Sequence, residues 1–327
     1  MFIVSKNKFS IATKLSALLL FIVSVFGLTA CDYQFRVDRP IIIISRDSAS
    51  GTREAFFTLL FGSKQADIRL KLGSIELNST AAILARVSSD PQSIGYDSLG
   101  FVNDSVKLLP VDKYLPTTQN ILDDKYKLWR PLSVLYRIDR MKQRHLSAFN
   151  DFLQSQQAQD IVQSRGYVNF PSSEGYAEYK PIADLVGTIR VSGSTTVEPM
   201  MQRLREKFLD YQPNCKIELT AAGSGPGRND IKNDNSDFGM QSAVVTQSHI
   251  DDIEQGAGVG NVGQTNLAID AIAVIVHSSN YLGIPKSDLT DDIQEQGQSV
   301  TMQNLANLID NDSGVSFATW KAMLEFQ

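Results

Sequence analysis

Four consecutive isoleucines, Ile41–Ile44, constrain the fold more than any other feature of the chain. A short β-branched run that ends in polar and small residues is typical of a strand buried on both faces of a sheet. Behind it, Thr52–Leu60 has apolar residues at helical spacing, with Ala55 and Phe56 on one face. Strand, small-residue loop and helix together indicate one α/β unit.

The same order of elements recurs along the chain. Strands are predicted at Ser93–Tyr96, Leu132–Tyr136, Ile189–Ser192, Lys216–Thr220 and Ile269–Val276, and helices at His145–Gln163 and Pro199–Asp210. Strands that alternate with helices predict an α/β fold with mostly parallel sheets and helices on both faces. Residues 171–187 have no regular period and read as a connector between two halves.

The first thirty residues have the order of an export signal. Lys6, Lys8 and Lys14 come without an acidic residue and are followed by the apolar run Leu15–Leu28. This run is shorter than the roughly twenty residues that a membrane-spanning helix needs. We therefore expect residues 1–30 to be a signal peptide that a peptidase removes.

The end of this segment, Leu28-Thr29-Ala30-Cys31, resembles a bacterial lipobox. The resemblance implies that Cys31 is the first mature residue and carries a lipid, with residues 31–39 as a tether. Asp32 resembles the signal that keeps Gram-negative lipoproteins in the inner membrane, facing the periplasm. The alternative is an ordinary secretion signal with an incidental cysteine.

Composition excludes several classes of function. Removal of the three signal lysines leaves 28 basic and 36 acidic residues, a net charge of −8, which argues against nucleic-acid binding. Only Cys215 remains after Cys31, so no intrachain disulfide is possible. The three histidines lie far apart without companion ligands, and no nucleophile elbow occurs. We expect no metal, no cofactor and no enzymatic activity.

Three loops carry the chemistry of the chain: Arg46–Thr52, Gly193–Val197 and Gly223–Gly227. Each follows a predicted strand and is built largely of Gly, Ser and Thr. Free backbone amides at a helix N-terminus and the helix dipole favour anions there, and hydroxyl groups add uncharged donors. One such loop could be an ordinary cap or turn. Three of them, at the carboxyl ends of strands, predict an anion site.

These loops also resemble those of a known family, the PstS-type phosphate-binding proteins of phosphate ABC importers. The resemblance lies in Ser45–Phe56, Gly193–Pro199, Gly223–Gly227 with Asp237–Gly239, and Ile269–Asn280, and it extends to Ser93–Tyr96, Arg130–Leu132 and Phe149–Val168. It implies a periplasmic-binding-protein fold with two α/β lobes that close on a ligand. It further implies a monomer that delivers inorganic phosphate to an ABC permease in the inner membrane.

The order of these motifs is rotated, since the family normally begins with the Gly-Ser-Thr-Thr-Val loop. The chain thus resembles a circular permutant, cut between Trp320 and Ile41, with the usual ends joined through residues 171–188. This order implies one lobe from 38–108 plus 267–327 and another from 109–266. Crossing strands are expected near 105–112 and 264–270. A fragment of a two-gene fusion is the alternative.

The resemblance also implies roles for individual residues. Arg46 becomes the cationic clamp of a tetrahedral oxyanion. The other implied ligand-binding residues are Ser50, Gly51 and Thr52 in one lobe and Thr195, Thr196, Ser224, Gly225, Asp237 and Ser242 in the other. The alternative for Arg46 is a surface ion pair with Asp47 or Glu54.

Selectivity between anions stays open at this point. Phosphate carries a proton near neutral pH, so a carboxylate acceptor would favour it over sulfate. Some family members have an aspartate where Ser242 stands, and others have a Ser-Arg pair where this chain has Ser242-Ala243. Asp237 or Asp47 could act as acceptor instead. The remaining alternatives are a binder of another oxyanion such as sulfate, an oxyanion-sensing signalling lipoprotein, and a surface protein that has lost its ligand.

Overall fold

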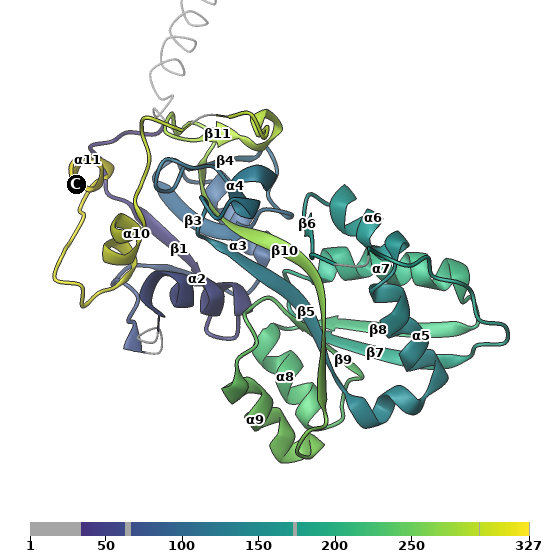
Figure 1. Ribbon diagram of the computed structural model, residues 1–327. Coiled ribbons are helices and arrows are strands. Elements are labelled where there is room, and N and C mark those ends of the chain that lie inside the picture. The colour runs from purple at the N-terminus through teal and green to yellow at the C-terminus, as the bar shows by residue number, and fades with distance from the viewer. Residues whose placement is uncertain (1–33, 63–66, 173–174, 294, 327) are drawn as a thin grey trace, which may run out of the picture. The chain divides into compact units, whose positions relative to one another are not determined.

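The computed structural model describes residues 34–62, 67–172, 175–293 and 295–326 (Figure 1). The chain divides into Met1–Gln34 and a compact unit, Phe35–Gln327, to which everything below refers. The predicted signal peptide and Cys31 lie outside the described residues. Within the described ranges, no helix has both the length and the apolar character needed to cross a membrane.

The first of two large cores is built around β1 (Ile42–Arg46), which pairs in parallel with β2 (Ile75–Leu77) and β3 (Ser93–Ser98). Helix α2 (Gly51–Phe61) covers one face, where Phe56 stacks on Tyr96 at a centroid distance of 4.0 Å. Helix α3 (Thr80–Ser88) covers the other face. The remaining elements of this half are β4 (Val106–Leu108), β11 (Ile284–Pro285), η3 (Lys286–Asp288), α4 (Thr118–Leu122), α10 (Met302–Ile309) and α11 (Trp320–Glu325).

The second core lies around β7 (Gly187–Gly193), which pairs in parallel with β8 (Cys215–Ala221) and β9 (Phe238–Gln241). Its centre is aromatic, and Phe149, Phe152, Phe208 and Phe238 are fully buried. The helices of this half are η2 (Ile138–Lys142), α5 (Arg144–Leu153), α6 (Gln156–Ser164), α7 (Glu198–Tyr211), α8 (Ser224–Lys232) and α9 (Gln247–Ala257).

Two long strands connect the cores, β5 (Trp129–Arg137) and β10 (Val262–His277), which run side by side (Figure 1). The first half of β10 pairs with β5 and, briefly, with β6 (Val168–Asn169), whereas its second half pairs with β3 and β4. The buried residues of the first core come from 35–128 and 269–323, and those of the second core from 132–268. Both cores are therefore held by one continuous strand.

Two expectations about this architecture need correction. All pairings of β10, and that of β5 with β9, are antiparallel, so the sheet is mixed and not mostly parallel. The first crossing also differs from the expected 105–112. Val106, Leu109 and Val111 are buried in the first core, and the chain crosses only at β5. The local apolar pattern of these segments does not reveal which core they join.

Most predicted elements are confirmed within a few residues, but β10 begins at Val262, seven residues before the predicted strand, and one predicted helix is divided. The expected helix over His145–Gln163 is two helices, because α5 ends at Leu153 and Ser155 caps α6 by accepting a bond from the Ala158 amide at 3.3 Å. Residues 171–172 and 175–186 contain no helix or strand, as expected for a connector.

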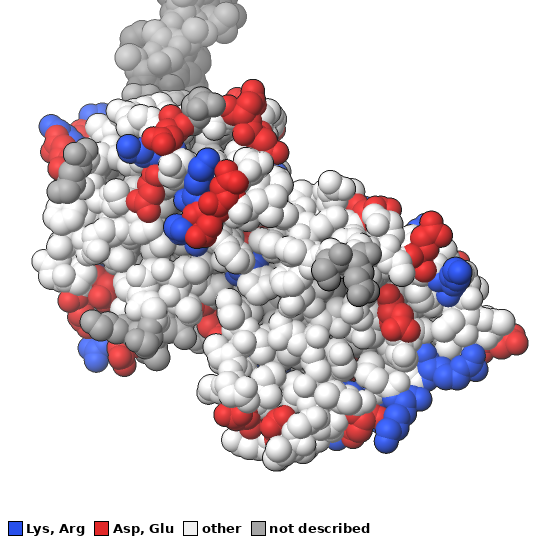
Figure 2. Space-filling model, in the orientation of Figure 1, with Lys and Arg blue, Asp and Glu red and all other residues white. Residues whose placement is uncertain are grey.

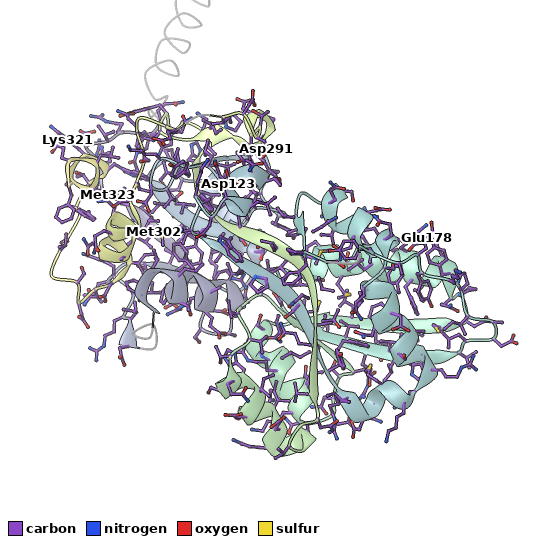
Figure 3. The ribbon with its side chains drawn as sticks, in the orientation of Figure 1. Asp123, Glu178, Asp291, Met302, Lys321 and Met323 are labelled. Carbon is purple, nitrogen blue, oxygen red and sulfur yellow. The ribbon has the colours of Figure 1, made fainter. Side chains whose placement is uncertain are left out.

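The two ends of the compact unit lie together. Phe35, expected in the tether, is 8% exposed and packs edge-on against Trp320 with ring centroids 5.2 Å apart. The Lys321 amide donates to Val37 O at 2.8 Å. Helices α10 and α11, which carry Met302 and Met323 in Figure 3, are joined where Asn304 Nδ2 donates to Met323 O at 3.3 Å. The C-terminal helix α11 thus packs against the first residues of the compact unit.

Candidate functional site

The three Gly/Ser/Thr loops lie together at the carboxyl ends of β1, β7 and β8, and α2, α7 and α8 follow them. Arg46 Nη2 donates to Thr195 Oγ1 at 2.9 Å, and the hydroxyls of Thr52 and Thr196 are 2.7 Å apart. These bonds join residues about 150 positions apart in sequence and link the two cores. The expected convergence of the loops is therefore present in the structure.

Glycine allows the loops to approach this closely. A side chain on Gly51 would overlap the Ser224 hydroxyl and would come within 2.8 Å of Ser242 Oγ. Gly223 has φ = 114°, and a Cβ there would lie 2.6 Å from Ala49 O. The Gly225 amide donates to the same oxygen at 3.4 Å. Larger residues at Gly51 or Gly223 would hold the loops apart.

Hydroxyl groups of the second core form a chain at this point. Ser194 Oγ donates to Ser242 Oγ at 2.8 Å, and Ser242 Oγ lies 3.3 Å from Ser224 Oγ. Ser194 also accepts from the Thr196 amide at 3.1 Å, while Ser50 caps α2 by accepting from the Thr52 amide at 3.2 Å. The loops thus bring hydroxyls and helix N-termini to one place, which suits an anion.

Arg46 is 1% exposed, and its guanidinium lies among these groups. Nη1 donates to Thr80 Oγ1 at 3.2 Å and Nη2 to Asn78 O at 3.4 Å, in addition to Thr195. Burial lowers its pKa, whereas the charges of Asp97 and Asp47 raise it. No ion pair joins Arg46 to Asp47 or Glu54 among the described residues, so the surface ion-pair alternative is wrong. Arg53 instead pairs with Glu76.

Sequence reasoning missed four buried polar residues beside the loops: Thr80, Arg130, Asp97 and Asp270. Arg130 Nη2 donates to Thr52 Oγ1 at 3.1 Å and forms a fully buried ion pair with Asp270 at 3.1 Å. Burial raises the pKa of Asp270, while Arg130 opposes that rise. Burial of a charged residue in an apolar strand costs free energy unless the charge is paired. Asp97 in β3 and Asp270 in β10 are acidic residues of this kind, so the sequence did carry a sign of a buried charged site at these two positions.

Asp237 does not lie with the other predicted residues. It immediately precedes β9, and its carboxylate accepts from Arg190 Nη2 at 2.8 Å and Nε at 3.2 Å. Arg190 and Asp237 lie beside each other three residues before β7 ends, because β7 and β9 run in parallel. The anion loop begins only at the end of β7. The structure therefore gives Asp237 an ion pair with Arg190 and not a place in the loop cluster.

A second link between the cores borders the cluster. Glu54 on α2 is bound through Oε2 to Arg228 Nη2 at 3.0 Å and through Oε1 to His249 Nε2 at 3.0 Å. Burial alone would raise the pKa of Glu54, but the bonds from His249 and Arg228 hold it below its usual value. A cavity of about 430 Å³ adjoins this contact and is lined by Glu54, Arg130, Ala243 and His249 among others.

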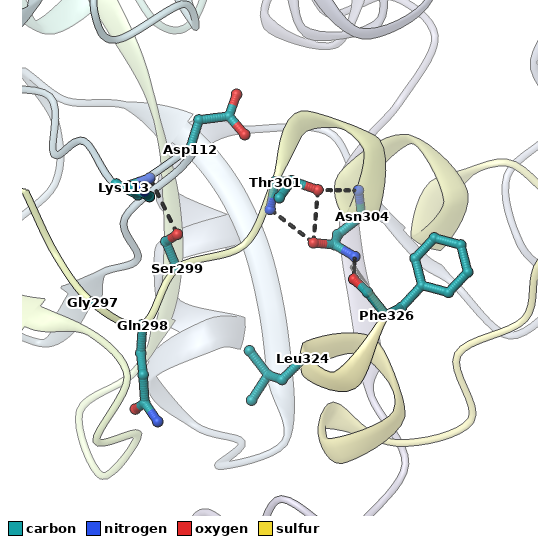
Figure 4. A pocket seen from close by; sticks show the side chains of 9 residues that line it. All are labelled: Asp112, Lys113, Gly297, Gln298, Ser299, Thr301, Asn304, Leu324 and Phe326. Atoms are coloured by element: carbon teal, nitrogen blue, oxygen red, sulfur yellow. Dashed lines mark hydrogen bonds between the residues drawn. The ribbon is translucent and has the colours of Figure 1, made fainter.

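A larger pocket, of about 610 Å³, lies in the first half of the molecule between residues 112–113 and α10 (Figure 4). Its polar groups bond to one another: Thr301 N and Oγ1 donate to Asn304 Oδ1, and the Lys113 amide donates to Ser299 Oγ at 3.1 Å. None of the three loops contributes to its lining. Its larger volume alone therefore does not make it a candidate for the anion site.

The face shown in Figure 2 has charged side chains of both signs, which are interspersed over it. Asp123 and Asp291, labelled in Figure 3, both accept bonds from Gln119 at the start of α4. Among the described residues, no cluster of three or more His, Cys, Asp and Glu side chains could hold a metal ion.

Comparisons with known proteins agree with this geometry. A family model described as a PBP superfamily domain matches residues 180–308. Phosphate-binding protein PstS 2 of Streptococcus pneumoniae serotype 4 is 31% identical over 269 residues, which cover 79% of this chain and 87% of that protein. PstS 2 of Streptococcus agalactiae serotype V is 31% identical over 247 residues, which cover 73% and 79%. The chain belongs to the PstS family.

A solved structure extends the PstS match to three dimensions. The phosphate-binding protein of a phosphate ABC transporter from S. pneumoniae TIGR4 superposes with a TM-score of 0.62 at 25% identity, covering 87% of this chain and 99% of that one. The expected α/β periplasmic-binding-protein fold is thereby confirmed. PstS proteins are substrate-binding proteins, so this member is a binding protein and not an enzyme, as expected.

Proposed function

We propose that this protein captures inorganic phosphate between two lobes, one around each core, and delivers it to an ABC importer. The observation that carries the proposal is the meeting of Arg46 with Thr195, since it joins a buried guanidinium from one core to a hydroxyl loop from the other. A guanidinium fork matches two oxygens of a tetrahedral anion. The relatives of this chain are named as phosphate-binding proteins.

The same contacts suggest how the ligand would hold the lobes closed. A bound anion would replace the Arg46–Thr195 and Thr52–Thr196 bonds with bonds to its own oxygens. Ser50, Gly51 and Thr52 would act from one lobe, and Thr195, Thr196, Ser224, Gly225 and Ser242 from the other. Opening at β5 and β10 would then release it.

The sensing alternative uses the same site with a different partner. A signalling lipoprotein would bind the anion and report it to a membrane sensor. A neighbouring permease gene supports the importer, whereas a neighbouring sensor kinase gene supports signalling.

We further propose that the mature chain begins at a lipid-modified Cys31 and stays on the periplasmic side of the inner membrane. Replacement of Cys31 by serine should then move the protein from the membrane fraction to the soluble fraction. Retention of Cys31→Ser in the membrane would contradict the anchor.

We also propose that the order of the motifs is circularly permuted relative to those PstS proteins that begin with the Gly-Ser-Thr-Thr-Val loop. The contact between Val37 and Lys321 supports this, because neighbouring ends are what a permutation requires.

Calorimetric titration with phosphate, arsenate and sulfate tests the main proposal. We expect one phosphate site per chain with a Kd of about 1 µM or below. Arsenate, which has the same shape and also carries a proton, should compete. The absence of micromolar phosphate binding would overturn the proposal.

A further inference from the structure

Asp97 is a buried carboxylate that lies beside Arg46. Strands β1 and β3 run in parallel with Ile43 opposite Ile94, and the same register continued three residues brings Arg46 next to Asp97. Tyr96 faces α2, so its neighbour Asp97 faces the opposite side of the sheet, where α3 begins. Arg46 reaches the same side, because it donates to Thr80 at the start of α3.

Both side chains keep an unused polar atom. Asp97 is 0% exposed, and its Oδ1 accepts from the Ser98 amide at 2.8 Å. Its Oδ2 has no hydrogen-bond partner among the described residues, and neither has Arg46 Nε. No ion pair joins the two side chains within the described structure. A buried acceptor without a partner is costly, which makes this atom a candidate for contact with a ligand or its proton.

The protonation state of Asp97 sets the net charge of a buried charge cluster, which consists of Arg46, Asp97, Arg130 and Asp270. Arg46 faces Asp97 from β1, Arg130 from β5 and Asp270 from β10. Because Arg130 and Asp270 form a buried pair, the cluster has a charge of +1 with Asp97 neutral and of zero with Asp97 ionised. Burial raises the pKa of Asp97 to about 6, against the opposing effect of Arg46. Its charge therefore changes close to neutral pH.

We propose that Asp97 is the selectivity residue of the site, favouring an oxyanion that carries a proton over sulfate. This inference rests on the proposed function. An ionised Asp97 repels an anion that has no proton to share, and it accepts the proton of an anion that has one. The sequence pointed to Asp237 or Asp47 for this task. Asp237 lies away from the loops, and Asp47 is half-exposed, whereas Asp97 is fully buried next to the clamp.

The unchanged protein provides the first test. Titration of the full chain with sodium sulfate should show tighter binding at pH 5 than at pH 8 by about tenfold or more, since sulfate needs Asp97 neutral. Phosphate affinity should change less over the same range. Equal sulfate affinity at both pH values, in a protein that binds phosphate, would overturn the inference.

The isosteric variant Asp97→Asn provides the second test. It should bind sulfate about tenfold more tightly than the unchanged protein at pH 8, and its sulfate affinity should lose its dependence on pH. Asp90→Asn is the matched control, because Asp90 pairs with Arg86 in the same half of the molecule. We expect no change in anion selectivity in that control.

The outcomes separate the two proposals. A folded Asp97→Asn protein with an unchanged ratio of phosphate to sulfate affinity would contradict the role of Asp97 in selectivity. It would not contradict the proposal that the protein captures phosphate. Failure of the unchanged protein to bind phosphate would instead defeat the proposed function. If Asp97→Asn did not fold, as judged by circular dichroism, the pH series on the unchanged protein would decide alone.

Discussion

The Arg46 side chain makes several of the bonds on which the proposed site depends. Its guanidinium bonds to Thr80 and Asn78 within the first core and to Thr195 in the second, although it is almost completely buried. A planar fork with several donors is needed to serve partners in different directions, and an ammonium group lacks that geometry.

Replacement of Arg46 by lysine should therefore weaken phosphate binding while the charge is kept. We expect a loss of about 2 kcal/mol, or roughly thirtyfold in Kd, from calorimetry. Arg86→Lys is the control, because Arg86 pairs with Asp90 away from the loops. Equal losses in both variants would show that Arg46 has no special place in binding.

Asp97 should also make the stability of the ligand-free protein depend on pH. Its folded-state pKa of about 6 lies above the usual value of 3.8. The folded state therefore binds the proton more tightly, and the stabilisation it gains is complete below pH 3.8 and lost as pH rises through 6. Asp97→Asn should accordingly raise Tm at pH 8 and change it little at pH 4. A lower Tm at pH 8 would contradict this.

At the scale of elements, two further contacts join the halves, besides β5, β10 and the bonds of Arg46 and Thr52 to the Gly193–Val197 loop. They are the loop before α2 against the loop before α8, and Glu54 against α8 and α9. Gly51→Ala would place a methyl group against Ser224 and Ser242. We expect this variant to keep its fold, because the clash lies between halves, and to lose most of its phosphate affinity. Gly297→Ala, with no atom within 4 Å of the added carbon, is the control. Normal binding by Gly51→Ala would show that close approach is not required.

The Glu54 contact should govern how long the ligand stays bound. Glu54→Gln weakens two bonds, to Arg228 and to His249, that exist only while the halves are together. Stopped-flow measurements should show faster phosphate release with little change in the association rate. Glu76→Gln, which alters a pair with Arg53 inside one half, should leave release unchanged. Identical release rates in both variants would exclude a closing role for Glu54.

At the scale of the whole molecule, local pattern predicted most elements and the loop cluster, but not how distant strands assemble. The three loops could be found because each joins a predicted strand to a run of small residues in one short segment, and two of them lead into a predicted helix. Arg130, Asp97 and Asp270 meet only because β10 pairs antiparallel with both β3 and β5. Asp237 was misplaced for the same reason, since its position depends on the pairing of β9 with β7. Such non-local pairings have no signature in a single segment.

A crystal structure of the protein grown with phosphate would show whether the three loops bind the anion. We expect one tetrahedral ligand bound by the Arg46 guanidinium, with the Ser50–Thr52 loop on one side and Thr195, Thr196 and Ser224 on the other. Phosphate bound elsewhere, such as in the pocket near α10, with the Arg46–Thr195 bond intact, would contradict this expectation.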